Sequence, residues 1–227
     1  MYEQVPALST PNRSGVDVRA RLTREEVADA ALALVDEQGL EALTMRRLAE
    51  SLGVGTMTLY GYVRDKDELL DAVVEAATSR DPFRRVDGPW QERLRALARQ
   101  SHAGLIRHPA LVELRLRRPI LTPGAFRVTE LAFEALLEAG FSRPEAARVF
   151  RVFFLYVFGS AAFNQPELSA PVRAATRGAI ASLPEDEYPL LSGSADAVAV
   201  TTGGAEQFEY GLELLIEGIE ARLAAAP

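Results

Sequence analysis

The chain has 227 residues, of which 48% are hydrophobic and 25% are charged, the usual balance of a folded globular protein. Ala, Leu, Val, Glu and Arg dominate and aromatic residues make up only 7%, which favours helices over sheets. Cysteine is absent, which excludes disulfides and thiolate metal sites, and two histidines are too few for a histidine-rich zinc site. We therefore expect an all-α protein with no metal and no cofactor.

Charge and hydropathy bear on location and partners. No apolar run is long enough to span a membrane, and residues 1–17 lack the apolar core of a secretory signal, so we expect a cytoplasmic protein with no membrane partner. The formal net charge of −7 is unfavourable for a nucleic-acid binder, because phosphate neutralisation needs cations. A local basic surface is enough for DNA binding, however, so net charge does not exclude that function.

The start of the chain carries clear local signals. Residues 1–20 contain Pro, Gly and Asn with no apolar repeat, which predicts a flexible arm. Thr23 followed by Glu26 has the spacing of a capping box, in which each side chain satisfies a backbone N–H of the other residue. We predict a helix that begins at Thr23 and ends at Gly39, where glycine can adopt the left-handed conformation.

The next segment has a helix-turn-helix pattern. A second helix is predicted over 44–53, and a third, very short helix from Thr56 through Tyr60 or Tyr62. None of the three helices could bury its apolar stripe alone, so they must pack together, with a glycine-containing turn between the second and the third. We predict a three-helix helix-turn-helix domain over residues 21–66.

Longer helices dominate the rest of the chain. We predict a larger helical domain for effector binding and dimerisation over residues 67–227. Within it, the Pro- and Gly-containing segment 164–204 is predicted to be a loop with one or two short helices. Helices are predicted to begin at Asp65 and to span 90–107, 110–117, 123–139, 142–163 and 205–223.

The segment from Leu48 to Leu70 resembles the TetR family of transcriptional regulators. A small-residue helix, a Gly-Val turn, a Leu-Tyr pair in the third helix, and an aromatic and a basic residue before the fourth all agree over about residues 22–75. A weaker resemblance, through Trp90-Gln91, Arg118-Pro119 and the last helix, points to the tetracycline-repressor branch. Together the two resemblances span most of the chain.

The resemblance implies a ligand-responsive repressor that binds a pseudo-palindromic operator in double-stranded DNA as a homodimer. A small apolar or amphipathic effector would release it. A short recognition helix fits the major groove with its N-terminal residues facing base edges. Tyr60 could instead be half core, and Arg46 and Arg47 could be ordinary solvated charges. The implied DNA contacts are Thr44, Arg46, Arg47, Thr56, Met57, Thr58, Tyr60, Tyr62 and Lys66.

The aromatic run over 150–158 allows two interpretations. It could be dimer and domain core, or it could form one wall of a ligand cavity between facing helices. In the tetracycline repressor a histidine just ahead of the Arg-Pro pair binds the metal of the drug, and Leu114 takes that position here, so a magnesium–tetracycline effector is not expected. The candidate ligand-binding residues are His102, Arg107, Arg117, Arg118, Phe153, Phe154 and Val157.

Two predicted helices, 144–163 and 205–223, resemble the pair that forms a four-helix bundle across the two-fold axis of the family's dimers. A closed two-fold dimer presents its recognition helices about one DNA turn apart, ~34 Å. The interface residues that this resemblance implies are Phe150, Phe158, Ala162, Phe208, Leu212, Leu215 and Ile219.

The sequence also bears on two alternatives to a repressor, an enzyme and a small-molecule binding or adaptor protein. The sequence has no phosphate-binding glycine loop, no Gly-x-Ser-x-Gly elbow and no paired His-Glu metal motif, which argues against an enzyme. The alternative is a small-molecule binding or adaptor protein whose helix-turn-helix no longer binds DNA, and the acidic net charge keeps it open. The threonines of the third helix and Lys66 favour a working DNA reader, because a degenerate one would be free to lose them.

Overall fold

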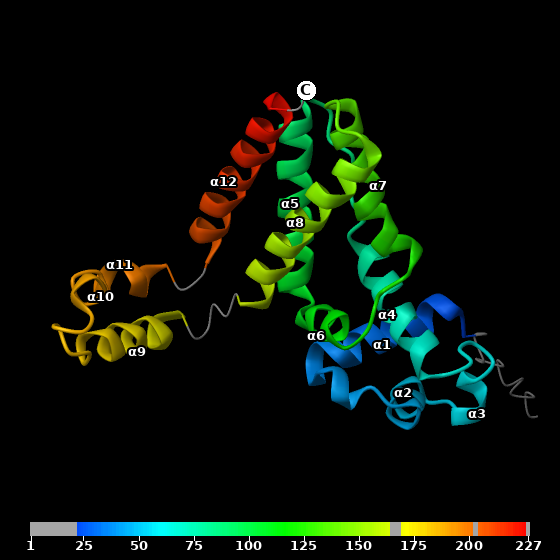
Figure 1. Ribbon diagram of the computed structural model, residues 1–227. Coiled ribbons are helices and arrows are strands. Elements are labelled where there is room, and N and C mark those ends of the chain that lie inside the picture. The colour runs from blue at the N-terminus through cyan, green and yellow to red at the C-terminus, as the bar shows by residue number, and fades with distance from the viewer. Residues whose placement is uncertain (1–21, 164–168, 202–203, 226–227) are drawn as a thin grey trace, which may run out of the picture.

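The computed structural model describes residues 22–163, 169–201 and 204–225, and all regular structure in these ranges is helical, which confirms the all-α prediction (Figure 1). No helix within these ranges is both long and apolar enough to cross a bilayer. The predicted arm over 1–20 lies outside the described residues. The helices are α1 (Arg24–Gln38), η1 (Leu40–Ala42), α2 (Met45–Leu52), α3 (Thr56–Leu59), α4 (Lys66–Arg80), α5 (Trp90–Arg107), α6 (Pro109–Arg117), α7 (Pro123–Glu138), α8 (Arg143–Ala162), α9 (Ser169–Ala181), α10 (Pro189–Ser192), α11 (Ala195–Val200) and α12 (Ala205–Ala224).

Local capping chemistry sets the ends of the first helices. The predicted capping box is confirmed, because the Glu26 N–H donates to the Thr23 hydroxyl at 3.1 Å and the Thr23 N–H donates to the Glu26 carboxylate at 2.7 Å. Gly53 ends α2 in the left-handed region, with φ of +65°. That conformation turns the chain within three residues into α3, and it strains any residue with a side chain.

The first core joins α1–α4 into one unit that also includes part of the effector half. Leu32, Leu48, Leu59 and Leu69 are fully buried in it, so α4 packs in the same core as the three helices of the helix-turn-helix. Leu114 of α6 belongs to this core as well. The effector half therefore begins with a helix that is packed into the DNA-binding half.

The Glu68 side chain links the start of α4 to α1 and to the residues just before α4. Its carboxylate accepts hydrogen bonds from the Arg64 backbone N–H at 2.8 Å and from the guanidinium of Arg24, at the start of α1, at 2.6 Å. The Arg64 backbone and side chain together hold the pKa of Glu68 well below its usual range, at about 2. A carboxylate held in this way stays ionised, so the contact between α1 and α4 persists at neutral pH.

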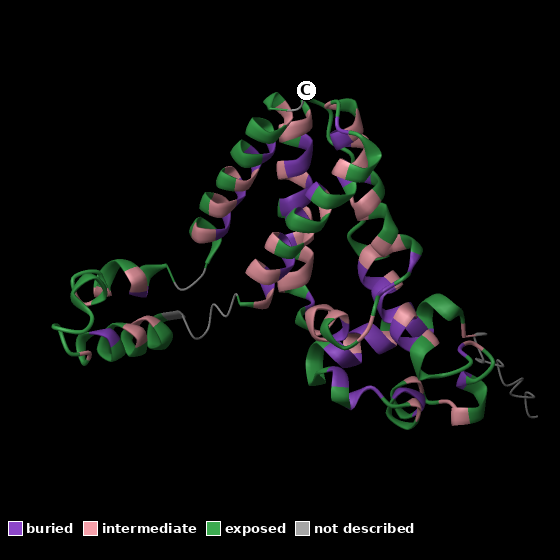
Figure 2. Ribbon diagram, in the orientation of Figure 1, coloured by how far each residue is buried: buried purple, intermediate pink, exposed green. Residues whose placement is uncertain are grey.

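The second core is a bundle of α5, α7, α8 and α12, which stand side by side above the DNA-binding half (Figures 1 and 2). Leu136, Phe153, Leu212 and Ile216 are each at most 2% exposed in its centre. On its flank, two arginines of α5 bind two glutamates of α12, with nitrogen–oxygen distances of 2.7 and 2.6 Å. These partly exposed pairs fix the register of α12 more than they add stability.

Gly211 lets α12 approach α8 closely. A Cβ atom at this position would lie 2.5 Å from the Tyr156 hydroxyl oxygen, which itself donates to the Phe208 carbonyl oxygen at 2.5 Å. We expect Gly211→Ala to lower the free energy of unfolding by about 1–3 kcal/mol relative to Gly218→Ala, because overpacking displaces side chains. A Cβ at Gly218 would meet nothing within 4 Å. Equal urea-unfolding curves for the two variants would contradict this packing.

The segment after α8 is more helical than the sequence suggested. Where a loop with one or two short helices was predicted, α9, α10 and α11 form a unit that projects away from the bundle (Figure 1). Ile180 and Ala199 are buried there. Pro171 and Pro189 lie in the first turns of α9 and α10, where proline is compatible with a helix, so they were misleading as loop signals.

Candidate nucleic-acid interface and ligand cavity

The recognition helix α3 buries one face in the first core and exposes the other to solvent. Leu59 is completely buried, whereas Met57 on the same short helix is 81% exposed and is accompanied by the exposed Thr58. An exposed methionine on a rigid base offers apolar contact to a thymine methyl, and a threonine hydroxyl can serve base donors or acceptors. Thr56 is half-buried at the start of the helix, and Tyr60 is 48% exposed just after it.

The cationic side chains beside α3 differ in whether they already form an ion pair within the protein. Arg46 binds Glu50, four residues on, with its Nε 2.9 Å from the carboxylate, so it would have to exchange that partner for a phosphate. Arg47 and Lys66 are exposed and form no ion pair within the described part of the chain. Thr44 accepts the Arg47 backbone N–H at 3.2 Å, so this threonine caps α2 and keeps only its hydroxyl proton for a phosphate.

The nine residues predicted to contact DNA lie on α2, α3 and the segments next to them, at the end of the molecule away from the bundle (Figure 1). Seven are exposed, and Thr56 and Tyr62 are half-buried. Tyr62 packs against the first core, which leaves only part of its ring for a sugar-phosphate contact. The arrangement can present base-reading side chains and phosphate-binding cations together.

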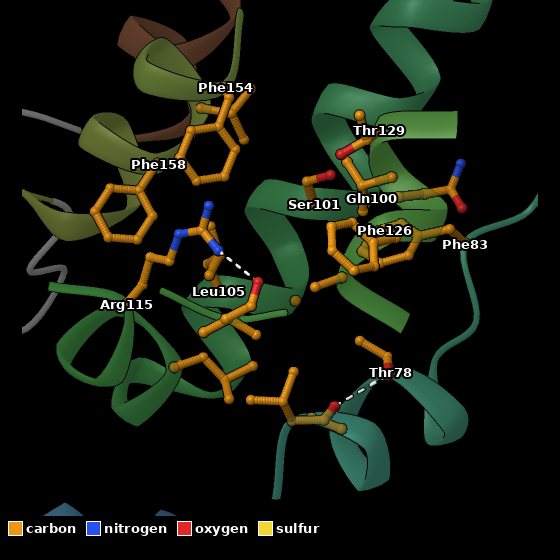
Figure 3. A pocket seen from close by; sticks show the side chains of 18 of the residues that line it. Thr78, Phe83, Gln100, Ser101, Leu105, Arg115, Phe126, Thr129, Phe154 and Phe158 are labelled. Atoms are coloured by element: carbon orange, nitrogen blue, oxygen red, sulfur yellow. Dashed lines mark hydrogen bonds between the residues drawn. The ribbon is translucent and has the colours of Figure 1, made fainter. Parts of the chain in front are cut away.

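A cavity of about 230 Å³ lies between the C-terminal end of α4 and helices α5–α8 (Figure 3). Six phenylalanines and several aliphatic side chains make most of its wall. Polar residues form the smaller part of the wall, as is typical of a small-molecule site. They are Thr78, Asp81, Gln100, Ser101, Arg107, His108, Arg115, Thr129 and Arg151.

The predicted ligand residues divide into two groups. Phe153, Phe154, Val157 and Arg107 line the cavity, although Arg107 forms an ion pair with Asp81. His102 lies outside, where it stacks on Phe208 with ring centroids 3.9 Å apart. Burial lowers the pKa of His102, so it is neutral at pH 7.

Arg117 and Arg118 also lie outside the cavity, at the junction of the two halves. Arg117 binds Glu41 of η1 at 2.6 Å, and Arg118 binds Asp67 and Asp71 of α4. The structure therefore assigns these two arginines, at and just after the end of α6, to contacts with η1 and α4. A further junction contact joins His108 to Asp36 of α1, with 2.9 Å between Nδ1 and the carboxylate.

The sequence prediction missed several polar residues of the cavity, of which Arg115 and Ser101 are the most informative. Arg115 lies four residues after Leu111, and Ser101 lies four residues before Leu105, so both share a helix face with a wall residue. That spacing was the available signal. It could not be used without knowing which face of α5 and of α6 points inward.

The predicted dimer residues lie mostly inside their own protomer. Phe208, Leu212 and Ile219 are at most 5% exposed in the second core, and Leu215 packs against it. Phe150 and Phe158 line the cavity, and on α8 Phe150 and Ala162 are partly exposed. The outward apolar side chains of the two helices are Val152, Leu155, Tyr210 and Leu214, which are 50–63% exposed.

An exposed recognition helix, joined through α6 to a helical domain with an internal cavity, defines a one-component transcriptional regulator that responds to a ligand. Comparison with known families agrees. The family model of tetR-family bacterial regulatory proteins matches residues 27–73, and the tetracyclin repressor-like C-terminal domain matches residues 81–223. The chain therefore belongs to the TetR family.

Individual relatives cover nearly the whole chain. The HTH-type transcriptional repressor DrrR1 of Streptomyces coeruleorubidus is 33% identical over 95% of this chain and 83% of its own length. The class D tetracycline repressor protein of Escherichia coli is 32% identical over 91% of this chain and 93% of its own. Among solved structures, the Streptomyces coelicolor protein ActR in complex with actinorhodin has a TM-score of 0.77 and 28% identity, over 90% of this chain and 99% of that one.

Proposed function

We propose that this protein is a cytoplasmic repressor that binds a pseudo-palindromic operator as a homodimer and releases it when a small effector fills the cavity. The observation that carries the proposal is the position of α6. Its Leu111 and Arg115 line the cavity, while its Leu114 lies 1% exposed in the core of the DNA-binding half. A ligand that displaces α6 must therefore also act on the helix-turn-helix. We do not propose an enzymatic activity.

The relatives support a role for the cavity. ActR has been solved with actinorhodin and with (S)-DNPA, and an Acinetobacter baumannii TetR variant with minocycline. We propose that here too the free dimer holds its recognition helices at operator spacing, ~34 Å apart, and that ligand favours a state in which α4 has swung. Reversing a 1:99 balance of the two states requires about 5.5 kcal/mol of differential binding.

The dimer is proposed to form through the outward faces of α8 and α12. Val152 and Leu155 lie on α8, and Tyr210 and Leu214 lie on α12. All four side chains are 50–63% exposed in the single chain. Exposed apolar side chains gathered on neighbouring helices are typical of an interaction surface. The two-fold symmetry of such a contact matches the symmetry of a palindromic operator.

Binding of the full-length protein to the DNA upstream of its own gene, over a series of salt concentrations, tests the DNA-binding role. We expect Lys66→Ala and Arg47→Ala each to weaken binding on all sequences and to reduce the salt slope of the dimer by about 2, because each removes one phosphate contact from each protomer. Arg127→Ala, which removes an exposed arginine of α7 in the effector half, is the control and should bind like the wild type. An unchanged slope in both test variants would contradict the placement of the phosphate contacts.

A further inference from the structure

Two arginines at the cavity have no acidic partner. The Arg115 and Arg151 guanidiniums lie 4.9 and 5.9 Å from the centroid of the same ring, that of Phe154, and neither forms an ion pair within the described ranges. The single carboxylate on the cavity wall, Asp81, is already bound to Arg107. The cavity therefore carries an uncompensated positive charge at one end.

Arg115 is the more strongly desolvated of the pair. It donates one hydrogen bond to the neutral Ile120 carbonyl oxygen at 3.1 Å, and it has no anionic partner among the described residues. Burial lowers the pKa of Arg115, and the nearby charge of Arg151 lowers it further. Because a guanidinium stays protonated at neutral pH, the cost of desolvation and repulsion remains in the empty cavity. An anion bound between the two arginines would offset both costs.

The remaining wall suits a flat apolar body with a polar group. Six phenylalanines line the cavity, among them Phe154 and Phe158, which stack with centroids 5.6 Å apart beside Arg115 (Figure 3). Ring-lined walls favour aromatic guests, which can stack in offset or edge-on geometry. Ser101 lies in a separate group with Gln100 and Thr129, and its hydroxyl oxygen is shielded from solvent and has no hydrogen-bond partner among the described residues. A buried hydroxyl of this kind is available to a polar atom of a ligand.

We propose that the effector is an aromatic carboxylate or a chemically equivalent aromatic anion, with its acid group held by Arg115 and Arg151 and its rings packed among the phenylalanines. This inference rests on the proposed role of the cavity and names the chemical class that the cavity selects. Arg115 also links the ligand to DNA binding, because it lies one residue from Leu114, which is packed in the DNA-binding core. An acid group that draws Arg115 toward the cavity would move α6 with it.

Calorimetric titration of the full-length protein with three probes tests the proposal. The probes are 2-naphthoate, its neutral analogue 2-naphthamide, and the aliphatic acid octanoate. We expect the wild type to bind 2-naphthoate at least about tenfold more tightly than either of the others, since a charge-assisted hydrogen bond and an aromatic fit act together. Arg115→Gln should reduce the preference for 2-naphthoate over 2-naphthamide, the double variant Arg115→Gln and Arg151→Gln should abolish it, and binding of 2-naphthamide should stay unchanged in both.

Two further variants keep the result interpretable. Arg115→Lys retains the charge without the planar fork and should keep part of the preference for the acid, whereas Arg143→Gln, at the exposed start of α8, should change nothing. Equal binding of acid and amide by the wild type, an acid preference that is unchanged when both Arg115 and Arg151 are replaced by Gln, or no binding of 2-naphthoate would each overturn the proposal. Release of operator DNA by neutral molecules alone would also overturn it, while leaving the repressor function intact. If the protein bound the acid tightly but bound no operator DNA, the proposed effector class would stand and the repressor function would be overturned.

Discussion

Leu114→Ala is expected to lower the free energy of unfolding by about 2–5 kcal/mol, because it opens a cavity in a core that has little room to collapse. Leu114 is 1% exposed and joins α6 to the core formed by α1–α4. Thermal and urea unfolding measure the loss. Leu116→Ala is a matched control on the same helix, since Leu116 is 72% exposed and its removal should stay within about 0.5 kcal/mol of the wild type.

The same variant should also weaken the link between ligand and DNA. With a smaller side chain at 114, a displacement of α6 is passed on less completely to the DNA-binding half, so more ligand is needed to release the operator. The ratio of operator affinities with and without a bound ligand measures this link. If Leu114→Ala and Leu116→Ala reduced that ratio equally, α6 would not be the coupling element.

Replacing both exposed side chains of the recognition helix, in a Met57→Ala and Thr58→Ala double variant, should remove most sequence preference. Each lost base contact costs about 1–3 kcal/mol and the dimer loses four, two from each protomer, so operator affinity should fall by roughly 10³-fold or more, toward the affinity for unrelated DNA. Binding to unrelated DNA should hardly change, because the phosphate contacts remain. Stability should also be kept, because both side chains are exposed.

Competition between operator and unrelated DNA measures this loss of preference. Leu190→Ala provides the control, since Leu190 is an 87% exposed apolar residue on α10, in the projecting unit. A double variant that lost affinity for both DNAs by the same factor would mean that α3 supports the fold and does not read bases.

The DNA-binding half was predictable because its signals are local. The capping box at Thr23, the glycine at 53 and the apolar spacing of α1 and α2 each act within a few residues, and the structure has all of them. The residues predicted to contact DNA also come from one short stretch of chain. The family resemblance named them, and the structure exposes seven of the nine.

The cavity and the dimer face were harder because they depend on which way each helix is rotated. Two residues along a helix correspond to about 200°, so Arg117 faces the junction while Arg115 faces the cavity. On α12, Leu212 points into the core and Leu214 points outward for the same reason. Periodicity finds an apolar stripe, but it does not say whether the stripe packs in its own protomer or against another.

The acidic net charge does not describe the surface beside the recognition helix. Many charges cancel in pairs that hold helices together, such as Glu209 and Glu213 with the arginines of α5. Arg47 and Lys66 stay unpaired among the described residues, beside the recognition helix. The overall charge of −7 is therefore compatible with a locally cationic surface for DNA.

Selection of bound fragments from the DNA of its own genome, with the full-length protein and no added ligand, tests whether the protein binds a specific operator as a dimer. We expect enrichment of a pseudo-palindromic sequence with half-sites about one helical turn apart, ~34 Å. We also expect the Met57→Ala and Thr58→Ala double variant to lose that enrichment. Fragments retained without any shared sequence would contradict it, and would favour a ligand-binding or adaptor protein whose helix-turn-helix does not read DNA.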